Sequence, residues 1–287
     1  MHKDTAIFNI PAGHTCLFAK LCRSNANRET GKITDGPHTE FRCYATLPEN
    51  LFKNVRESRW RNFELLKQAK TVIGMANLIE SSIIGKENIK LVRMHSSGDF
   101  FSQSYFDAWL LFAQQHSELT VYGYTKALPF WIKRLNSIPA NMKLVASRGG
   151  THDVLIDALG LRSVKVVFSE EEAKKLGLEL DHDDCLCWKG TGDFGILLHS
   201  TQPAGSEAGR AWYKISKQGP GGYKSDYFHH YEKSGKGKKK KTIAVPVVTV
   251  KPVGKRLVNP NPRAGKITIT TKALAKVLSH KWIKVYA

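Results

Sequence analysis

Several common signatures are missing from this sequence of 287 residues. It has no run of about 18 apolar residues, so we expect no membrane-spanning helix. The N-terminus lacks the long apolar stretch of a secretory signal, which favours a chain that stays in a reducing cytoplasm. The motifs G-x-x-x-x-G-K-[ST], G-x-S-x-G, H-E-x-x-H and C-x3-C-x2-C are also absent. Their absence disfavours NTP hydrolysis and serine or zinc protease chemistry.

Acidic residues are scarce, because 25 Asp and Glu stand against 44 Lys and Arg, a net charge of +19. An excess of this size favours a polyanionic partner, and nucleic acid is the first expectation. No basic amphipathic helix with a broad apolar face stands out, which disfavours an anionic membrane as partner. Hydrophobic residues make up 41% of the chain, enough for a sizeable core.

Cysteine is also rare, yet the positions of the cysteines are the strongest indication of function in the sequence. The five residues form an N-terminal group and a downstream pair: Cys16, Cys22 and Cys43, then Cys185 and Cys187. In a reducing compartment thiols are more often ligands or catalysts than disulfides, and an odd number leaves one thiol over. We expect the N-terminal three to bind a metal centre, with Cys187 or Cys185 as fourth ligand. His14 is an alternative ligand. An all-thiolate set borne on loops favours a [4Fe–4S] cluster over zinc, which remains the alternative.

The middle of the chain alternates between strand and helix patterns. Branched apolar runs predict five strands, at residues 89–95, 119–125, 142–147, 164–169 and 194–200. Helical spacing and capping residues predict five helices, at residues 50–69, 72–84, 105–115, 129–135 and 170–176. Such alternation predicts an α/β fold with mostly parallel strands and helices outside the sheet. A partial or distorted (β/α) barrel and an open doubly wound sheet both fit, and we favour the barrel.

Composition changes after Tyr213, where Gly and Lys become frequent. We therefore divide the chain into a cysteine-bearing domain, 1–215, and a basic linker with a small β-rich extension, 216–287. A run of four lysines there would give salt-sensitive affinity for nucleic acid: Lys238, Lys239, Lys240 and Lys241. Tyr227 lies in a nearby aromatic stretch and is a candidate for stacking on bases.

Polar residues follow several of the predicted strands, at the end where chemistry gathers in barrels. The segment M-H-S-S-G-D-F-F-S contributes His95, Ser97 and Asp99, and Asp99 is a candidate general base, nucleophile or substrate ligand. Lys126 and Arg148 follow two further strands and could bind phosphate or carboxylate groups. Plainer roles are a helix cap for Asp99, core packing for His95 and surface charge for the two cations.

Taken together, I-P-A-G-H-T-C, C-Y-A, H-S-S-G-D-F-F-S, Y-T-K-A and C-x-C-W resemble the phage gene product 88 family, over residues 8–199. That family implies a phage origin and a host cytoplasm, and it has no established activity. A weaker resemblance is to radical-SAM-like phage proteins that carry a C-Y-A cysteine cluster. It implies that Cys16, Cys22 and Cys43 hold an iron–sulfur cluster, and it makes S-adenosylmethionine a candidate cofactor.

The leading hypothesis is an enzyme that modifies bases in nucleic acid. Its cysteines hold the metal or iron–sulfur centre, and five side chains line the site: Asp99, Ser97, His95, Lys126 and Arg148. One alternative is a base-exchanging, transglycosylase-like barrel with structural zinc, in which Asp99 attacks a glycosidic carbon. The other is a non-catalytic DNA- or RNA-binding protein stapled by its cysteines. Both nucleic acids, and any oligomeric state, fit these hypotheses.

Overall fold

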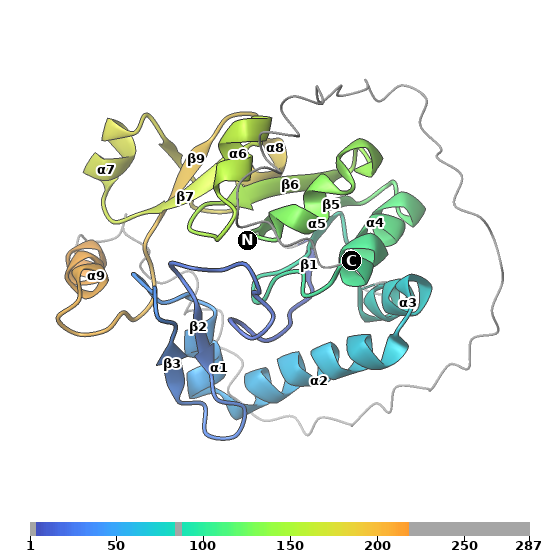
Figure 1. The fold of residues 1–287 in the computed structure, drawn as a ribbon, viewed down its shortest axis with the longest axis horizontal. Helices are drawn as coiled ribbons and strands as arrows, with labels where there is room; N and C mark the ends of the chain where they lie inside the picture. The colour runs from blue at the N-terminus through green and yellow to red at the C-terminus, as the bar shows by residue number, and fades with distance from the viewer. Residues whose placement is uncertain (1–3, 84–87, 218–287) are drawn as a thin grey trace.

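A seven-stranded sheet organises the molecule. The computed structural model describes residues 4–83 and 88–217. The strand order is β1-β4-β5-β6-β7-β9-β8, and every neighbouring pair is parallel. The strands are β1 (Thr5–Ile7), β4 (Leu91–Arg93), β5 (Thr120–Thr125), β6 (Met142–Ser147), β7 (Ser163–Val167), β8 (Glu179–Leu180) and β9 (Phe194–Leu197). The predicted α/β class with parallel strands is therefore confirmed (Figure 1).

Helices flank this sheet. They are α1 (Thr46–Leu51), α2 (Lys53–Ala69), α3 (Val72–Ile83), α4 (Gln103–Gln115), α5 (Leu128–Ile132), α6 (Val154–Leu159), α7 (Glu170–Lys175), α8 (Cys185–Lys189) and α9 (Glu207–Lys217). Each strand and helix predicted within the first 200 residues is present, with some ends shifted. Within the described residues β1 and β8 each pair on one side only, so the sheet does not close into a complete barrel. The predicted extension, 216–287, lies almost wholly outside the described residues.

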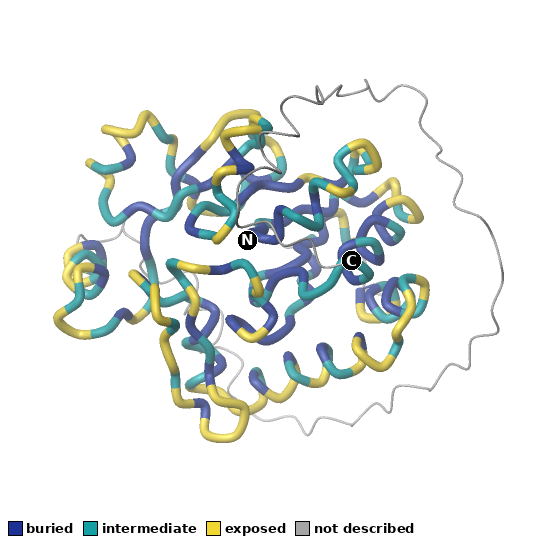
Figure 2. The backbone as a smooth tube through the Cα atoms, viewed as in Figure 1, coloured by how far each residue is buried: buried dark blue, intermediate teal, exposed yellow. Residues whose placement is uncertain are grey.

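The two faces of the sheet pack against different partners, because successive side chains of a strand point to opposite faces. Val121 of β5 belongs to the main core, where Leu66 of α2 and Trp109 of α4 are also buried. Tyr122, the next residue, packs on the other face with Cys187 of α8. Figure 2 shows buried backbone running through the centre of the molecule. Alternate residues of one strand thus face different neighbours. One face of the sheet packs against α2 and α4, and the other packs against α8.

The segment between Cys22 and Cys43 folds as a hairpin. Its strands, β2 (Ser24–Ala26) and β3 (Ile33–Asp35), pair antiparallel beside α1 (Figure 1). Arg42 donates two hydrogen bonds from its Nε and Nη2 atoms to Asp35, at 2.9 and 2.8 Å. The backbone N–H of Cys43 donates to the buried Ser24 Oγ at 3.1 Å. The hairpin therefore closes on itself and returns the chain from Cys22 to Cys43.

Candidate functional site

The N-terminal cysteine loop lies over the carboxyl edge of the sheet. The backbone N–H groups of Lys20 and Leu21 donate to the Gly149 oxygen at 3.1 and 3.0 Å, just after β6. Farther back in the loop, Thr15 Oγ1 accepts a hydrogen bond from the Asp99 N–H at 3.3 Å, in the turn that follows β4. These contacts fix Cys16 and Cys22 over the ends of β4 and β6, the edge at which ligands bind in open α/β sheets.

The three N-terminal thiols converge at this edge. Burial raises the pKa of Cys16 well above its ordinary value, and the neighbouring Asp99, Cys43 and Cys22 raise it further. Burial also raises the pKa of Cys43, with Cys22 as its strongest charged neighbour. All three residues are intermediate between buried and exposed. The hairpin thus brings Cys22 and Cys43, which are far apart in sequence, close to each other and to Cys16.

Asp99 is held rigidly beside them. Its Oδ1 accepts from Thr125 Oγ1 at 2.6 Å and from the Phe100 N–H at 2.8 Å, and its Oδ2 accepts from the Lys126 N–H at 2.8 Å. Burial raises the pKa of Asp99, and these hydrogen bonds lower it by a smaller amount. The cap of α4 is Ser102, whose Oγ accepts from the Tyr105 N–H at 3.1 Å. Asp99 therefore does not cap that helix, and its carboxylate makes its hydrogen bonds elsewhere.

Lys126 places a buried cation among these groups. Its Nζ donates to Ser147 Oγ at 2.5 Å. Burial lowers the pKa of Lys126, but its electrostatic interactions with Cys22, Asp99, Cys43 and Cys16 outweigh that effect, so the pKa is raised. Four acidic groups thus face one ammonium. The structure places Asp99, Lys126 and the N-terminal cysteines close together at one edge of the sheet, and their role as a site stays a prediction.

The turn before Asp99 needs glycine. Gly98 has φ +87°, a conformation that side chains with a Cβ rarely adopt. A Cβ built there would lie 2.4 Å from Ile10 Cγ1 and 2.7 Å from Thr15 Oγ1. The close approach lets the segment that leads to Cys16 rest directly on the turn that carries Asp99.

Sequence reasoning missed Glu49, which joins the loops of this site. Its Oε1 accepts from the Ala12 N–H at 2.9 Å, from Ser97 Oγ at 3.1 Å and from Arg59 Nη1 at 2.7 Å. Arg59 Nη1 also donates to the Ala45 oxygen at 2.7 Å. Glu49 and Arg59 are both buried. The pair therefore holds three segments together: the one with Ala12 before Cys16, the one with Ser97 before Asp99, and the one with Ala45 after Cys43. No local motif marks it, since its members lie on two separate helices.

Tyr44 was also missed as a site residue. Its hydroxyl donates to the Ser96 oxygen at 2.6 Å and accepts from Arg93 Nη2 at 3.1 Å. It directly follows Cys43, so it anchors that cysteine to the turn at the end of β4. In the C-Y-A motif the cysteine is the candidate metal ligand. The tyrosine has a structural role, because it anchors the motif to the turn at the end of β4.

The downstream cysteines lie elsewhere. Cys185 and Cys187 are on α8, and Cys187 is fully buried with Tyr122 and Phe194 on the other face of the sheet. Burial raises the pKa of Cys187 to about 12, and Asp184 is its strongest charged neighbour. Cys187 is therefore packed in the core rather than grouped with the N-terminal thiols, and its assignment as fourth ligand stays a prediction without support from this arrangement.

Four other predicted residues have partners that favour plainer roles. His95 is buried and its Nε2 lies 3.0 Å from Tyr105 Oη, and burial lowers its pKa to about 3. Arg148 pairs with Asp157 at 2.7 Å. Ser97 Oγ donates to the Ile10 oxygen at 2.9 Å. His14, the alternative ligand, stacks on Trp60 with ring centroids 4.5 Å apart. The candidate nucleic-acid contacts Tyr227 and Lys238 to Lys241 lie outside the described residues.

With this geometry established, comparison with known proteins places the chain. A family model described as Gene product 88 matches residues 2–214. The chain belongs to this family. The match includes the whole sheet and every residue of the thiol site, so the resemblance noted in the sequence is confirmed.

A phage relative supports this placement. The Gene 88 protein of Mycobacterium phage D29 is 32% identical over 90 residues, which cover 29% of this chain and 38% of that protein. The aligned part thus spans less than half of the relative's length. No solved structure matches the chain. The expected phage origin is supported, while the radical-SAM resemblance stays a prediction.

Two features are absent from the described residues. No helix there is long and apolar enough to span a bilayer, in agreement with the sequence. The same residues contain no group of three or more His, Cys, Asp or Glu side chains arranged around a single metal ion.

Proposed function

We propose that Cys16, Cys22 and Cys43 hold an iron–sulfur cluster and that the protein is a phage enzyme that modifies bases in nucleic acid within the host cytoplasm. One observation carries the proposal: three thiols meet Asp99 and the ammonium of Lys126 at the carboxyl edge of a parallel sheet. In α/β folds this edge is where substrates and cofactors bind.

The donor set fits a cluster better than zinc. Bonds of about 2.3 Å would hold the thiolates of a tetrahedral zinc ion only about 4 Å apart. A four-iron cluster spreads its thiolates more widely, because each binds a different iron. Such clusters usually take four ligands, and three thiols leave room for an exogenous one, for which S-adenosylmethionine is the candidate.

The protein's own residues prepare the site for this group. When bound, an iron–sulfur cluster supplies one-electron and radical chemistry. Lys126 places a positive charge beside thiolates that would otherwise repel one another. Asp99 is oriented by three hydrogen bonds and can accept a further donor from a bound substrate. The Glu49–Arg59 pair keeps the loops together without occupying the site.

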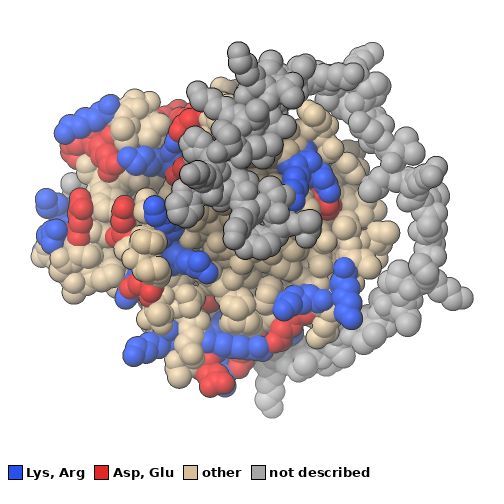
Figure 3. All heavy atoms as spheres, in the orientation of Figure 1, with Lys and Arg blue, Asp and Glu red and all other residues tan. Residues whose placement is uncertain are grey.

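Charge distribution supports nucleic acid as partner. Sixteen of the 44 Lys and Arg residues, but only two of the 25 Asp and Glu residues, lie after Lys217 in the sequence. Over the described surface in Figure 3, cations and anions are interspersed. The basic excess is therefore concentrated in the C-terminal part of the chain, which would hold the phosphate backbone while the sheet edge receives a base.

Anaerobic purification tests the cluster. We expect a brown protein with absorbance near about 400 nm and with iron and sulfide in equal amounts. Cys43→Ala should lose most of the iron, whereas Cys185→Ala, a matched substitution on α8, should keep it. A colourless, metal-free protein that is fully folded would remove the proposal. One zinc per chain without a chromophore would instead favour the transglycosylase-like alternative.

A further inference from the structure

A cavity of about 190 Å³ lies between α7, α9 and the ends of β7 and β9. Phe168 and Ser169 directly follow β7, and Leu197 ends β9, so the cavity opens at the same carboxyl edge as the thiol site. The neighbouring strand β6 ends at Ser147, the partner of Lys126. The cavity is thus next to the proposed reaction site along the sheet.

The cavity and the thiol site also share one apolar cluster. Leu197 and Ile215 are buried in it, and Phe168 packs against it. Cys22 packs against the same cluster, so its side chain and the cavity floor have apolar neighbours in common. A group seated in the cavity would therefore lie close to the loop that carries the cysteines.

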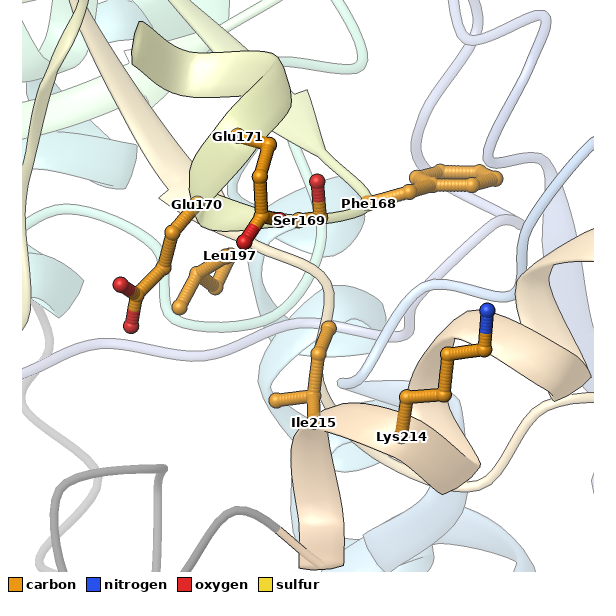
Figure 4. Close-up of a pocket in the computed structure, with 7 residues that line it drawn as sticks. All are labelled: Phe168, Ser169, Glu170, Glu171, Leu197, Lys214 and Ile215. Atoms are coloured by element: carbon orange, nitrogen blue, oxygen red, sulfur yellow. The ribbon is translucent and has the colours of Figure 1, made fainter.

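The walls combine an apolar floor with charged groups at the rim. Figure 4 shows Ser169, Glu170 and Glu171 on one side and Lys214 and Ile215 of α9 on the other. A hydrogen bond from the Glu171 backbone N–H and another from the Ser169 hydroxyl lower the pKa of Glu171, which keeps this carboxylate ionised and acceptor-only at neutral pH. The Lys214 side chain is exposed and supplies a cation at the opposite edge.

Size limits what can enter. Pockets for drug-sized ligands measure about 300–1,000 Å³, so this cavity accepts a single ring system and leaves the rest of a ligand outside. Enzymes that act on a base commonly extrude it from the strand into a close-fitting pocket of the active site. Carboxylates accept hydrogen bonds from exocyclic amino groups, as Glu and Asp do from cytosine N4.

We propose that this cavity receives one amino-bearing nucleobase of a single-stranded nucleic acid, with Glu171 accepting from the amino group and Lys214 contacting a phosphate. The inference rests on the proposed nucleic-acid substrate and names the base class that it would recognise. Thymine and uracil lack an exocyclic amino group and are expected to bind less tightly.

The test uses the full chain and fluorescently labelled homopolymers of dC, dA and dT at one fixed salt concentration. We expect dC and dA to bind about tenfold more tightly than dT, the discrimination typical of one base contact. Glu171→Gln should remove most of this preference, while Glu179→Gln, an exposed carboxylate on β8, should leave it unchanged. Lys214→Gln should weaken all three homopolymers to a similar extent.

Equal affinity for all three homopolymers, or the same preference in Glu171→Gln and in the wild type, would overturn the inference and leave the cavity a surface depression. Iron and sulfide are measured on the same preparations. A base preference in a protein without iron would support the base-binding cavity and contradict the cluster. Iron in a protein without a base preference would support the cluster and contradict the base-binding cavity. The two proposals can therefore fail separately.

Discussion

At the scale of single residues, burial decides what each ionisable group can do. The pKa of Lys126 is raised because Asp99 and the thiols of Cys16, Cys22 and Cys43 lie near its ammonium, and Lys126 keeps its charge. His95, only a few residues before Asp99, has no such partner and stays neutral, since burial lowers its pKa to about 3. Both were candidates for the same site. Their different surroundings favour a role in ligand binding for Lys126 and a packing role for His95.

The neutral state of His95 predicts a loss of stability in acid. The unfolded chain binds a proton below pH 6.5, whereas the folded chain does so only near pH 3. Stability therefore falls as pH decreases through this window, by at most about 1.4 kcal/mol per pH unit from this one group. His95→Gln keeps an acceptor for Tyr105 and should show a shallower decline in urea unfolding from pH 6.5 downward. Parallel declines in the two proteins would contradict the assignment.

At the scale of elements, the hairpin of β2 and β3 converts a sequence insertion into a support for two thiols. Its closure depends on Ser24, whose buried hydroxyl accepts from the Cys43 N–H. The Glu49–Arg59 pair links α1 and α2 to the same loops. Short elements with weak hydrophobic periodicity thus position the candidate cysteine ligands, whereas the long helices with clear hydrophobic periodicity form the core.

Ser24→Ala tests this support. It leaves the Cys43 N–H without its acceptor, which should cost about 1–3 kcal/mol of unfolding free energy. It should also reduce the iron bound per chain, because Cys43 would no longer be fixed. Thr30→Ala, at the exposed turn of the same hairpin, serves as the control for both measurements. Unchanged iron in a destabilised Ser24→Ala protein would show that the hairpin supports only the fold.

At the scale of the whole molecule, basic charge and the candidate site occupy different parts of the sequence. The thiol site lies within the family match of residues 2–214, and the densest run of lysines follows it. This separation predicts that affinity for nucleic acid and chemistry on it can be altered independently.

Replacing Lys238 to Lys241 with glutamine tests that separation. If these four side chains neutralise phosphates, the slope of log affinity against log salt for single strands should decrease by about 3. Iron content should not change. Four exposed lysines of the described part, replaced in the same way, are the control: Lys53, Lys70, Lys174 and Lys175. An equal decrease in both variants would show that the run has no special role.

The sequence by itself determined the class of fold and half of the candidate site. Strand and helix periods are local, and the carboxyl ends of parallel strands share one edge. The grouping of Asp99 with Lys126 therefore follows from the order of residues along the chain. Only tertiary structure showed that Cys187 is in the core and that Glu49 pairs with Arg59. These relations depend on how separate elements pack, because side chains far apart in sequence meet only once helices and strands are docked.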